Sequence, residues 1–188
     1  MKRIAIFASG NGSNAENIIQ YFKADNQVSV ELILTNNAKA KVLERADRLH
    51  IESKVFGRND FYHSDLVVNI LKDKSIDFIV LAGFMWLVPE NLISAYPDKI
   101  LNIHPALLPK YGGKGMYGDF VHQAVSDAGE TVTGISIHYV NAHYDEGSIV
   151  FQKEIAIEAG EDPDSIAKKI HELEYEYFPK LIDQLLKS

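Results

Sequence analysis

Leu-Asn-Ile-His-Pro-Ala-Leu-Leu-Pro, residues 101–109, is the stretch of this sequence that decides the fold. A strand is expected over residues 100–104, and it stops at Pro105, which cannot donate to a sheet ladder. Side chains alternate along a strand, so Asn102 and His104 share one face of it. An amide donor beside an imidazole can stabilise an oxyanion and move a proton. A polar strand end whose imidazole caps a nearby carbonyl is the alternative interpretation.

Before residue 100 the sequence alternates between short apolar runs and amphipathic segments. Continuous apolar runs are typical of parallel strands that are covered on both faces. We expect strands at residues 4–8, 30–35, 54–56 and 78–81, and helices at residues 14–23, 40–49, 60–74 and 89–96. The apolar stripe of the third helix is Leu66, Val67, Ile70 and Leu71. This alternation predicts an open, doubly wound parallel sheet.

After residue 109 the pattern changes. Residues 131–140 and 149–157 alternate between polar and apolar side chains, which is typical of an antiparallel pair with one wetter face. Residues 163–186 predict a closing amphipathic helix. The predicted fold class is therefore α/β: one open, doubly wound, mostly parallel, Rossmann-like sheet with antiparallel strands in its C-terminal part. Residues 1–188 are expected to form one domain.

Composition narrows the possible functions. Of the 188 residues, 46% are hydrophobic and 24% charged, as in a globular domain. The net charge of −7 argues against non-specific binding to nucleic acid or to an anionic membrane. The chain has no cysteine, which excludes disulfides, thiolate catalysis and zinc–thiolate sites. No stretch is long enough to span a bilayer, and the short apolar run at the N-terminus predicts a first strand. We expect a cytoplasmic protein with no nucleic-acid or membrane partner.

The loop after the first strand reads Gly-Asn-Gly-Ser-Asn-Ala at residues 10–15. It meets the loose dinucleotide pattern G-x-G-x-x-G/A, but residues 35–37, Thr-Asn-Asn, lack the carboxylate that would hold a ribose. Free N–H groups at a helix start, with the side chains of Ser13 and Asn14, still suit a phosphate. A tight turn capped by one of these residues is the alternative.

Two further segments carry candidate site residues. Residues 81–89, Leu-Ala-Gly-Phe-Met-Trp-Leu-Val-Pro, leave a strand where open α/β folds bind ligands, and suit either a flat aromatic ligand or ordinary core packing. In the turn at residues 141–147, Asp145 or Glu146 could reach His104 and raise its pKa. His138, His143 and Asp145 have a spacing that a metal could use, but no supporting ligand is evident, and we expect no metal site.

These motifs together resemble one known family. Their order and spacing, with Leu-Leu-Pro at residues 107–109, are similar to those of the 10-formyltetrahydrofolate-dependent formyltransferases. The Gly-Asn-Gly-Ser-Asn loop is the narrower sign, and it resembles the phosphoribosylglycinamide formyltransferases of purine biosynthesis. The likeness covers nearly the whole chain. Ala106 and the glycine-rich residues 110–118 depart from the family pattern, which leaves the role of the segment 112–118 open.

The resemblance implies three sets of site residues. The catalytic set would be Asn102, His104 and Asp145. The phosphoribosylglycinamide would lie against Asn11, Gly12, Ser13, Asn14 and Glu174. The folate would lie against Arg58, Met85, Trp86, Leu87, Val88, Asn141, Ala142, His143 and Tyr144. Asn59 competes with Arg58 for the folate tail, and Ser136 and His138 would have supporting roles.

The implied reaction transfers a formyl group from 10-formyltetrahydrofolate, a co-substrate, to the amine of 5-phosphoribosylglycinamide. The amine would attack directly, through a tetrahedral intermediate, and no metal would take part. A tRNA or sugar-amine formyltransferase, a nicotinamide-dependent oxidoreductase and a non-catalytic phosphosugar-binding protein remain alternatives. The sequence sets no oligomeric state.

Overall fold

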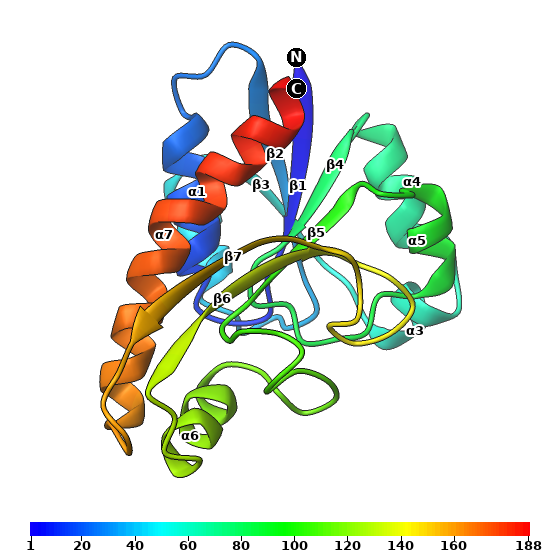
Figure 1. Cartoon of the computed structure of the whole chain (residues 1–188). Helices are drawn as coiled ribbons and strands as arrows, with labels where there is room; N and C mark the ends of the chain where they lie inside the picture. The colour runs from blue at the N-terminus through cyan, green and yellow to red at the C-terminus, as the bar shows by residue number, and fades with distance from the viewer.

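A seven-stranded sheet runs through the computed structural model, which describes residues 1–188 (Figure 1). Its strand order is β3-β2-β1-β4-β5-β6-β7. The strands from β1 to β5 pair in parallel, and β6 and β7 are antiparallel additions. The predicted fold class is confirmed. The strands are β1 Lys2–Phe7, β2 Val28–Thr35, β3 Glu52–Val55, β4 Phe78–Leu81, β5 Ile100–His104, β6 Val132–Tyr139 and β7 Ile149–Ala156.

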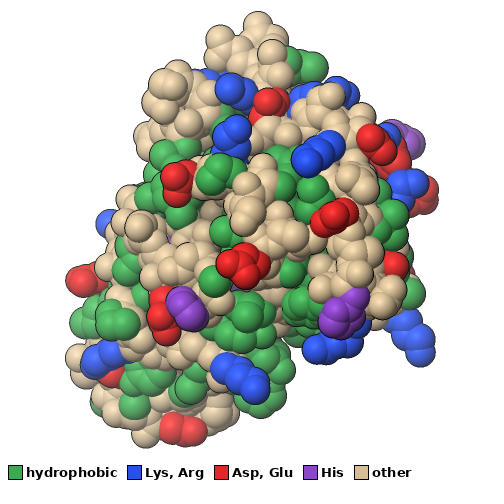
Figure 2. All heavy atoms as spheres, turned by 90° about the vertical axis from the view of Figure 1, so that its right-hand side faces the viewer, with side chains coloured by type: hydrophobic (Ala, Val, Ile, Leu, Met, Phe, Trp, Pro, Cys, Tyr) green, Lys and Arg blue, Asp and Glu red, His purple; other side chains and the backbone are tan.

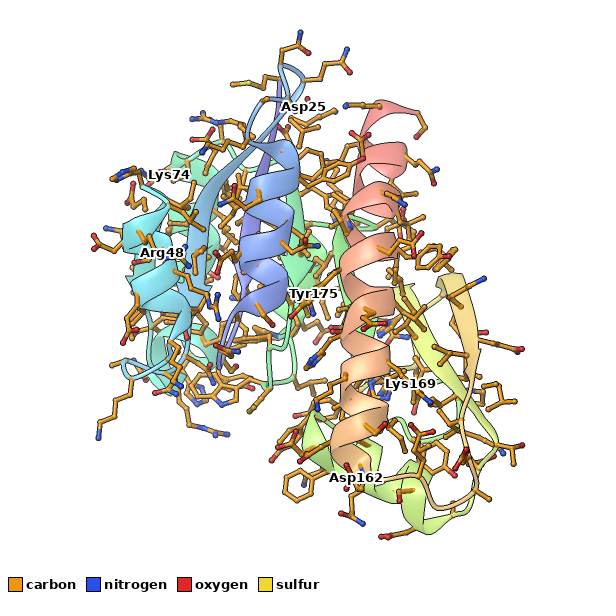
Figure 3. The ribbon with its side chains drawn as sticks, turned by 90° about the vertical axis from the view of Figure 1, so that its left-hand side faces the viewer. Asp25, Arg48, Lys74, Asp162, Lys169 and Tyr175 are labelled. Atoms are coloured by element: carbon orange, nitrogen blue, oxygen red, sulfur yellow. The ribbon has the colours of Figure 1, made fainter.

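Helices form two hydrophobic cores with the sheet. The larger core, of 29 buried residues, takes side chains from α1 (Ser13–Phe22), α2 (Val42–Arg48), α6 (Asp119–Asp127) and α7 (Pro163–Lys187). The second, of 16 buried residues, takes them from α3 (Arg58–Tyr62), α4 (Leu66–Asp73) and α5 (Glu90–Ala95). Figure 3 shows α1 lying beside α7, although the two helices are far apart in the sequence.

The single helix expected at residues 60–74 is wrong. The chain forms α3 and α4 instead, with a break at residues 63–65. In the break, the Ser64 hydroxyl donates to the Asp60 carbonyl at 2.9 Å and accepts from the Leu66 N–H at 3.2 Å. A serine side chain that bonds the local backbone competes with helical hydrogen bonds. The break also turns Leu66, expected in the apolar stripe, out to 46% exposure.

The helix α6 was not expected from the sequence. It follows the glycine-rich segment, and its buried residues Val121 and Val125 stand four apart, which is one helical turn. Its apolar residues Phe120, Val121, Ala124 and Val125 cover little more than one turn, which is too short to separate a helix from a loop. The other predicted elements are confirmed, with ends that differ by a few residues.

Strand register places the polar side chains of β5 opposite those of β6, at the carboxyl end of β5. Leu81 of β4 lies opposite Asn102 of β5, which in turn lies opposite His138 of β6. His104 lies opposite Ser136. The expected alternation is confirmed: Leu101 and Ile103 belong to the larger core, whereas Asn102 and His104 do not.

The outer surface is mixed. On the face formed by α3, α4 and α5, Figure 2 shows acidic and basic side chains scattered among apolar ones. None of the helices is both long enough and apolar enough to cross a membrane.

Candidate active site

The loops that follow β1 and β4 are joined at the carboxyl edge of the sheet. The Ser9 N–H donates to the Gly83 carbonyl at 2.9 Å, and the Ser9 hydroxyl accepts from the Met85 N–H at 3.0 Å. Open α/β sheets bind ligands at this edge. The edge therefore brings the glycine loop, the Met-Trp segment and the end of β5 together.

Asp145 lies at the centre of a polar cluster at the end of β5. Its Oδ2 is 3.6 Å from His104 Nδ1, and its Oδ1 is 3.6 Å from His138 Nε2. The Asn102 amide donates to Oδ1 at 3.4 Å, and the Gly113 N–H donates to Oδ2 at 3.0 Å. The structure thus brings the three expected catalytic residues together with His138.

His138 fixes the orientation of the Asn102 amide. The Tyr139 carbonyl can only accept, so His138 Nδ1 carries the hydrogen and donates to it at 2.9 Å. The neutral ring then accepts at Nε2 from Asn102 Nδ2, 3.0 Å away. Asp145 Oδ1 is a second acceptor for Asn102. Because His138 Nε2 and Asp145 Oδ1 each need an N–H donor, the NH₂ end of the Asn102 amide points into the cluster.

The ring of His104 has hydrogen-bond acceptors on both sides. Its Nε2–H donates to the Tyr111 carbonyl at 2.7 Å, and Nδ1 faces the Asp145 carboxylate. A neutral imidazole donates from one nitrogen only, so the Nδ1 lone pair faces a carboxylate. The His104 ring does cap a carbonyl, as the alternative interpretation of the sequence held, and it also faces Asp145.

The turn at residues 141–147 carries Asp145 back over the end of β5. Asp145 takes a left-handed backbone with φ 55°, which aspartate tolerates better than most residues. At Gly147 a Cβ would lie 1.6 Å from the Tyr139 carbonyl oxygen, so only glycine permits this return. Local backbone geometry thus brings the carboxylate over the end of β5, where Asn102 and the Gly113 N–H bind it.

A shallow pocket opens beside the cluster. Its free space of about 50 Å³ has room for only a few water molecules, and it opens to the solvent on one side. One wall is polar and the other apolar, as is usual for organic ligands. The lining residues are Leu81, Phe84, Trp86, Leu87, Val88, Asn102, His138, Val140, His143, Tyr144 and Asp145.

Four of the expected folate residues lie outside this lining. The Met85 side chain is 46% exposed, and Asn141 turns its Oδ1 inward to the His143 N–H at 2.9 Å. Ala142 is exposed. The Arg58 guanidinium stacks 5.2 Å from the Trp86 ring centroid and 5.5 Å from that of Tyr62, so it reaches the rim of the pocket through a lining residue.

The glycine loop presents an unpaired row of donors. None of the backbone N–H groups from Gly10 to Ala15 donates to an acceptor in the protein. Gly12 has φ +73°, and a Cβ there would lie 2.4 Å from a methyl group of Val42. Such a row of amides at the start of a helix is a site for an anion.

A buried carboxyl group lies beside this loop. Glu174 of α7 is 5% exposed and accepts from Asn14 Nδ2 at 2.8 Å. Burial raises its pKa to about 7, although the Asn14 hydrogen bond opposes the rise. The Oδ1 of Asn14 is buried without a partner, so the pair keeps one acceptor free for a ligand donor.

Comparison with known proteins identifies the family. The model of the formyl transferase family matches residues 2–182 of the chain. The chain belongs to the formyl transferase family. The resemblance drawn from its motifs is confirmed.

Named relatives span most of this formyl transferase. It is 40% identical over 191 residues to the phosphoribosylglycinamide formyltransferase of Bacillus subtilis (strain 168), covering 99% of the chain and 95% of the relative. Identity to that of Haemophilus influenzae is 34% over 187 residues, covering 97% and 86%. The crystal structure of phosphoribosylglycinamide formyltransferase from Bacillus halodurans superposes with TM-score 0.87 at 39% identity, covering 98% of this chain and 95% of that one.

Burial and charge oppose each other in the formyl transferase's cluster. Burial opposes ionisation of Asp145, but the neighbouring His138 and His104 and the hydrogen bond from the Gly113 N–H hold its pKa below the usual range. Asp145 reaches His104 and raises its pKa, as the sequence predicted, and the Tyr111 carbonyl raises it too. Burial outweighs both, because His104 is only 3% exposed, so its pKa lies below the usual range.

Other contacts of the formyl transferase's site could not be read from the sequence. The hydroxyl of Ser136 accepts from the Leu108 N–H at 2.9 Å and donates to the Ala106 carbonyl at 2.7 Å, which fixes the loop after β5. Tyr111 and Gly113 contact the cluster through backbone atoms, and every residue has such atoms, so the residue type does not reveal the contact. No cluster of three or more His, Asp or Glu side chains is arranged to hold a metal ion.

Proposed function

We propose that this formyl transferase moves the formyl group of 10-formyltetrahydrofolate to the amine of 5-phosphoribosylglycinamide, in the synthesis of purines. The observation that carries the proposal is that Asn102, His104 and Asp145 lie beside an apolar pocket, at the same sheet edge as an anion-binding loop. A folate ring suits the pocket and a phosphate suits the loop. The names of the relatives agree with formyl transfer to phosphoribosylglycinamide.

In the proposed reaction the amine nitrogen attacks the formyl carbon, and a C–N bond forms. The carbonyl oxygen takes the displaced electron pair. Asn102 Nδ2 donates to it with the hydrogen that, without substrate, makes the long 3.4 Å contact with Asp145 Oδ1. The bond to the folate nitrogen then breaks. The amine loses one proton and the folate nitrogen gains one, so no covalent enzyme intermediate is needed.

We assign the proton transfer to His104 and Asp145. Negative charge on the oxyanion adds to that of Asp145, so the His104 pKa rises as the intermediate forms. The imidazole can then accept the amine proton and pass it to the leaving nitrogen. Asp145 stays ionised and stabilises the imidazolium.

The proposed binding residues divide between the two substrates. The phosphoribosyl group is assigned to Asn11, Gly12, Ser13, Asn14 and Glu174. The folate is assigned to Arg58, Met85, Trp86, Leu87, Val88, Asn141, Ala142, His143 and Tyr144. Residues 1–188 act as one formyltransferase domain on small molecules in the cytoplasm, without nucleic-acid or membrane partners.

One assay tests this function. The protein is incubated with 10-formyltetrahydrofolate and, in parallel, with 5-phosphoribosylglycinamide, a sugar amine or methionyl-tRNA, while release of tetrahydrofolate is followed. We expect release with phosphoribosylglycinamide only. If tetrahydrofolate is released only with a rival amine, that amine is the acceptor in place of phosphoribosylglycinamide. If none of the three amines causes release, the proposal is overturned.

A further inference from the structure

Helix α2 contacts the glycine loop, residues 10–15, through the loop's carbonyl groups. The Val42 N–H donates to the Gly10 carbonyl at 3.1 Å. Arg45 Nε donates to the Asn11 carbonyl at 2.7 Å, and Arg45 Nη2 donates to Asn11 Oδ1 at 2.9 Å. One guanidinium therefore binds both acceptors of Asn11.

These contacts decide which way the loop donors face. In a trans peptide the C=O and the following N–H point in opposite directions. Because the carbonyls of Gly10 and Asn11 point toward α2, the N–H groups of Asn11 and Gly12 point away from it. The Asn11 Oδ1 is committed to Arg45, and its Nδ2 donates to no protein atom, so it too is available to a ligand.

The guanidinium is itself held in place. Arg45 Nη1 pairs with the carboxylate of Glu16, in the first turn of α1, and Arg48 Nη2 pairs with the other oxygen at 2.8 Å. Burial opposes ionisation of Glu16, but the two arginines hold its pKa below the usual range. Figure 3 shows Arg48 on α2, next to α1. Arg45 thus joins α1, α2 and the loop through its planar, forked group of donors.

We propose that Arg45 is a positioning residue for phosphate recognition. It does not need to touch the phosphate: it holds Asn11 and the peptide planes of the loop so that their donors converge on one anion. The inference rests on the proposed function, because it takes the ligand of the loop to be the phosphate of the amine substrate. Preorganised donors bind an anion more tightly than donors that must first be ordered.

Arg48 provides a matched control on the same helix. It carries the same charge and binds the same Glu16, but it makes no contact with Asn11. Arg45→Met and Arg48→Met therefore remove equal charge, and only the first releases the loop. Arg45→Lys keeps the charge but loses the fork, which separates geometry from electrostatics.

The experiment measures KM for each substrate, kcat, and the affinity for inorganic phosphate by NMR titration of the loop amides. For Arg45→Met we expect a KM for phosphoribosylglycinamide that is about ten- to a hundredfold higher, with weaker phosphate binding in proportion. The folate KM and kcat stay within about twofold of wild type, as do all constants for Arg48→Met. Arg45→Lys falls between them.

Each outcome decides a separate claim. Equal KM increases for both substrates, or equal effects of Arg45→Met and Arg48→Met, would overturn the positioning role. If Arg45→Met fails to fold, the same constants of Arg45→Lys decide, and values equal to wild type overturn the role. If the wild type binds phosphate in an Arg45-dependent way but transfers no formyl group, the proposed function fails and the positioning of the loop stands.

Discussion

At the scale of single residues, Asp145 links every polar side chain of the cluster. Asn102, His104 and His138 all lie within 3.6 Å of its carboxylate. Its negative charge opposes the burial that lowers the His104 pKa. Asp145 is therefore the carboxylate that favours the protonated form of His104.

Asp145→Asn keeps the size of the side chain and removes that charge. We expect the His104 pKa to fall further, since burial and His138 lower it and only the Tyr111 carbonyl remains to raise it. Turnover near neutral pH should fall about a hundredfold or more, because the imidazolium that forms when His104 takes the amine proton loses its stabilising charge. Lowering the pH should not restore turnover, since a protonated His104 cannot accept that proton. NMR titration of His104, together with a pH–rate profile, measures both effects.

Glu146→Gln is the control for this experiment, because Glu146 is an exposed acid next in the chain. It should leave the His104 pKa and the turnover near wild type. An unchanged His104 pKa in Asp145→Asn, with normal turnover, would reduce Asp145 to a turn residue.

Asn102→Ala removes the proposed oxyanion donor. We expect turnover to fall about a hundred- to a thousandfold, the usual cost of losing one such donor. Asn102 is only half-buried, so the melting temperature should change little. A large loss of stability with a matching loss of folded protein would favour a structural role instead.

The two kinds of site residue differed in how far the sequence could predict them. Asn102 and His104 followed from strand alternation alone, because a period of two fixes which side chains share a face. The residues alone left Asp145 and Glu146 as alternatives, and only the family resemblance pointed to Glu174, since each carboxylate meets its partners across a long sequence separation. The lowering of the His104 pKa by burial could not be predicted, because burial cannot be read from neighbours in the sequence.

At the scale of elements, the glycine loop depends on close packing against α2. Gly12→Ala places a Cβ 2.4 Å from a Val42 methyl group and forces alanine into φ +73°. We expect the KM for phosphoribosylglycinamide to rise much more than the KM for the folate. Steady-state kinetics with each substrate varied in turn checks this, and equal weakening of both would place the phosphate elsewhere.

A double variant tests how much of that effect comes from the Val42 methyl groups. Val42→Ala removes those methyl groups, but the Cβ of residue 42, at 2.6 Å, and the unfavourable backbone angle at residue 12 both remain. Gly12→Ala with Val42→Ala should therefore recover only part of the affinity. Full recovery would assign the whole effect to the clash.

Helices and strands were predicted correctly where no other local interaction opposed the pattern of apolar residues. The strands Phe78–Leu81 and Ile100–His104 end as predicted, because a continuous apolar run and Pro105 mark their limits. The helix at 60–74 failed because the Ser64 side chain outweighed an otherwise continuous helical pattern. The helix α6 was missed because its apolar pattern covers little more than one helical turn.

At the scale of the whole molecule, Glu174 makes stability depend on pH. Burial raises its pKa from 4.5 to about 7 in the folded chain. Between these values the folded state binds more protons than the unfolded state, so the free energy of unfolding falls as the pH rises through this window. Glu174→Gln removes this dependence.

We expect Glu174→Gln to be more stable than wild type at pH 8, by up to about 3 kcal/mol, and nearly equal to it at pH 4.5. Urea unfolding at several pH values measures the difference. Glu176→Gln, at an exposed position of the same helix, is the control and should show no such trend. A pH-independent difference for Glu174→Gln would contradict the raised pKa.

The segment that follows β5 supports the cluster with main-chain atoms only: the Tyr111 carbonyl and the Gly113 N–H. No side-chain substitution at Tyr111 or Lys114 deletes either group, so natural variation at these positions is free to proceed without loss of the support. Gly112 and Gly113 are different, because a Cβ at Gly112 would lie 2.5 Å from Leu108 and Gly113 has φ +95°. Among homologues, this segment should therefore keep its glycines while its other residues vary. A library randomised at those other positions, with the glycines fixed, should yield active enzymes with unrelated side chains.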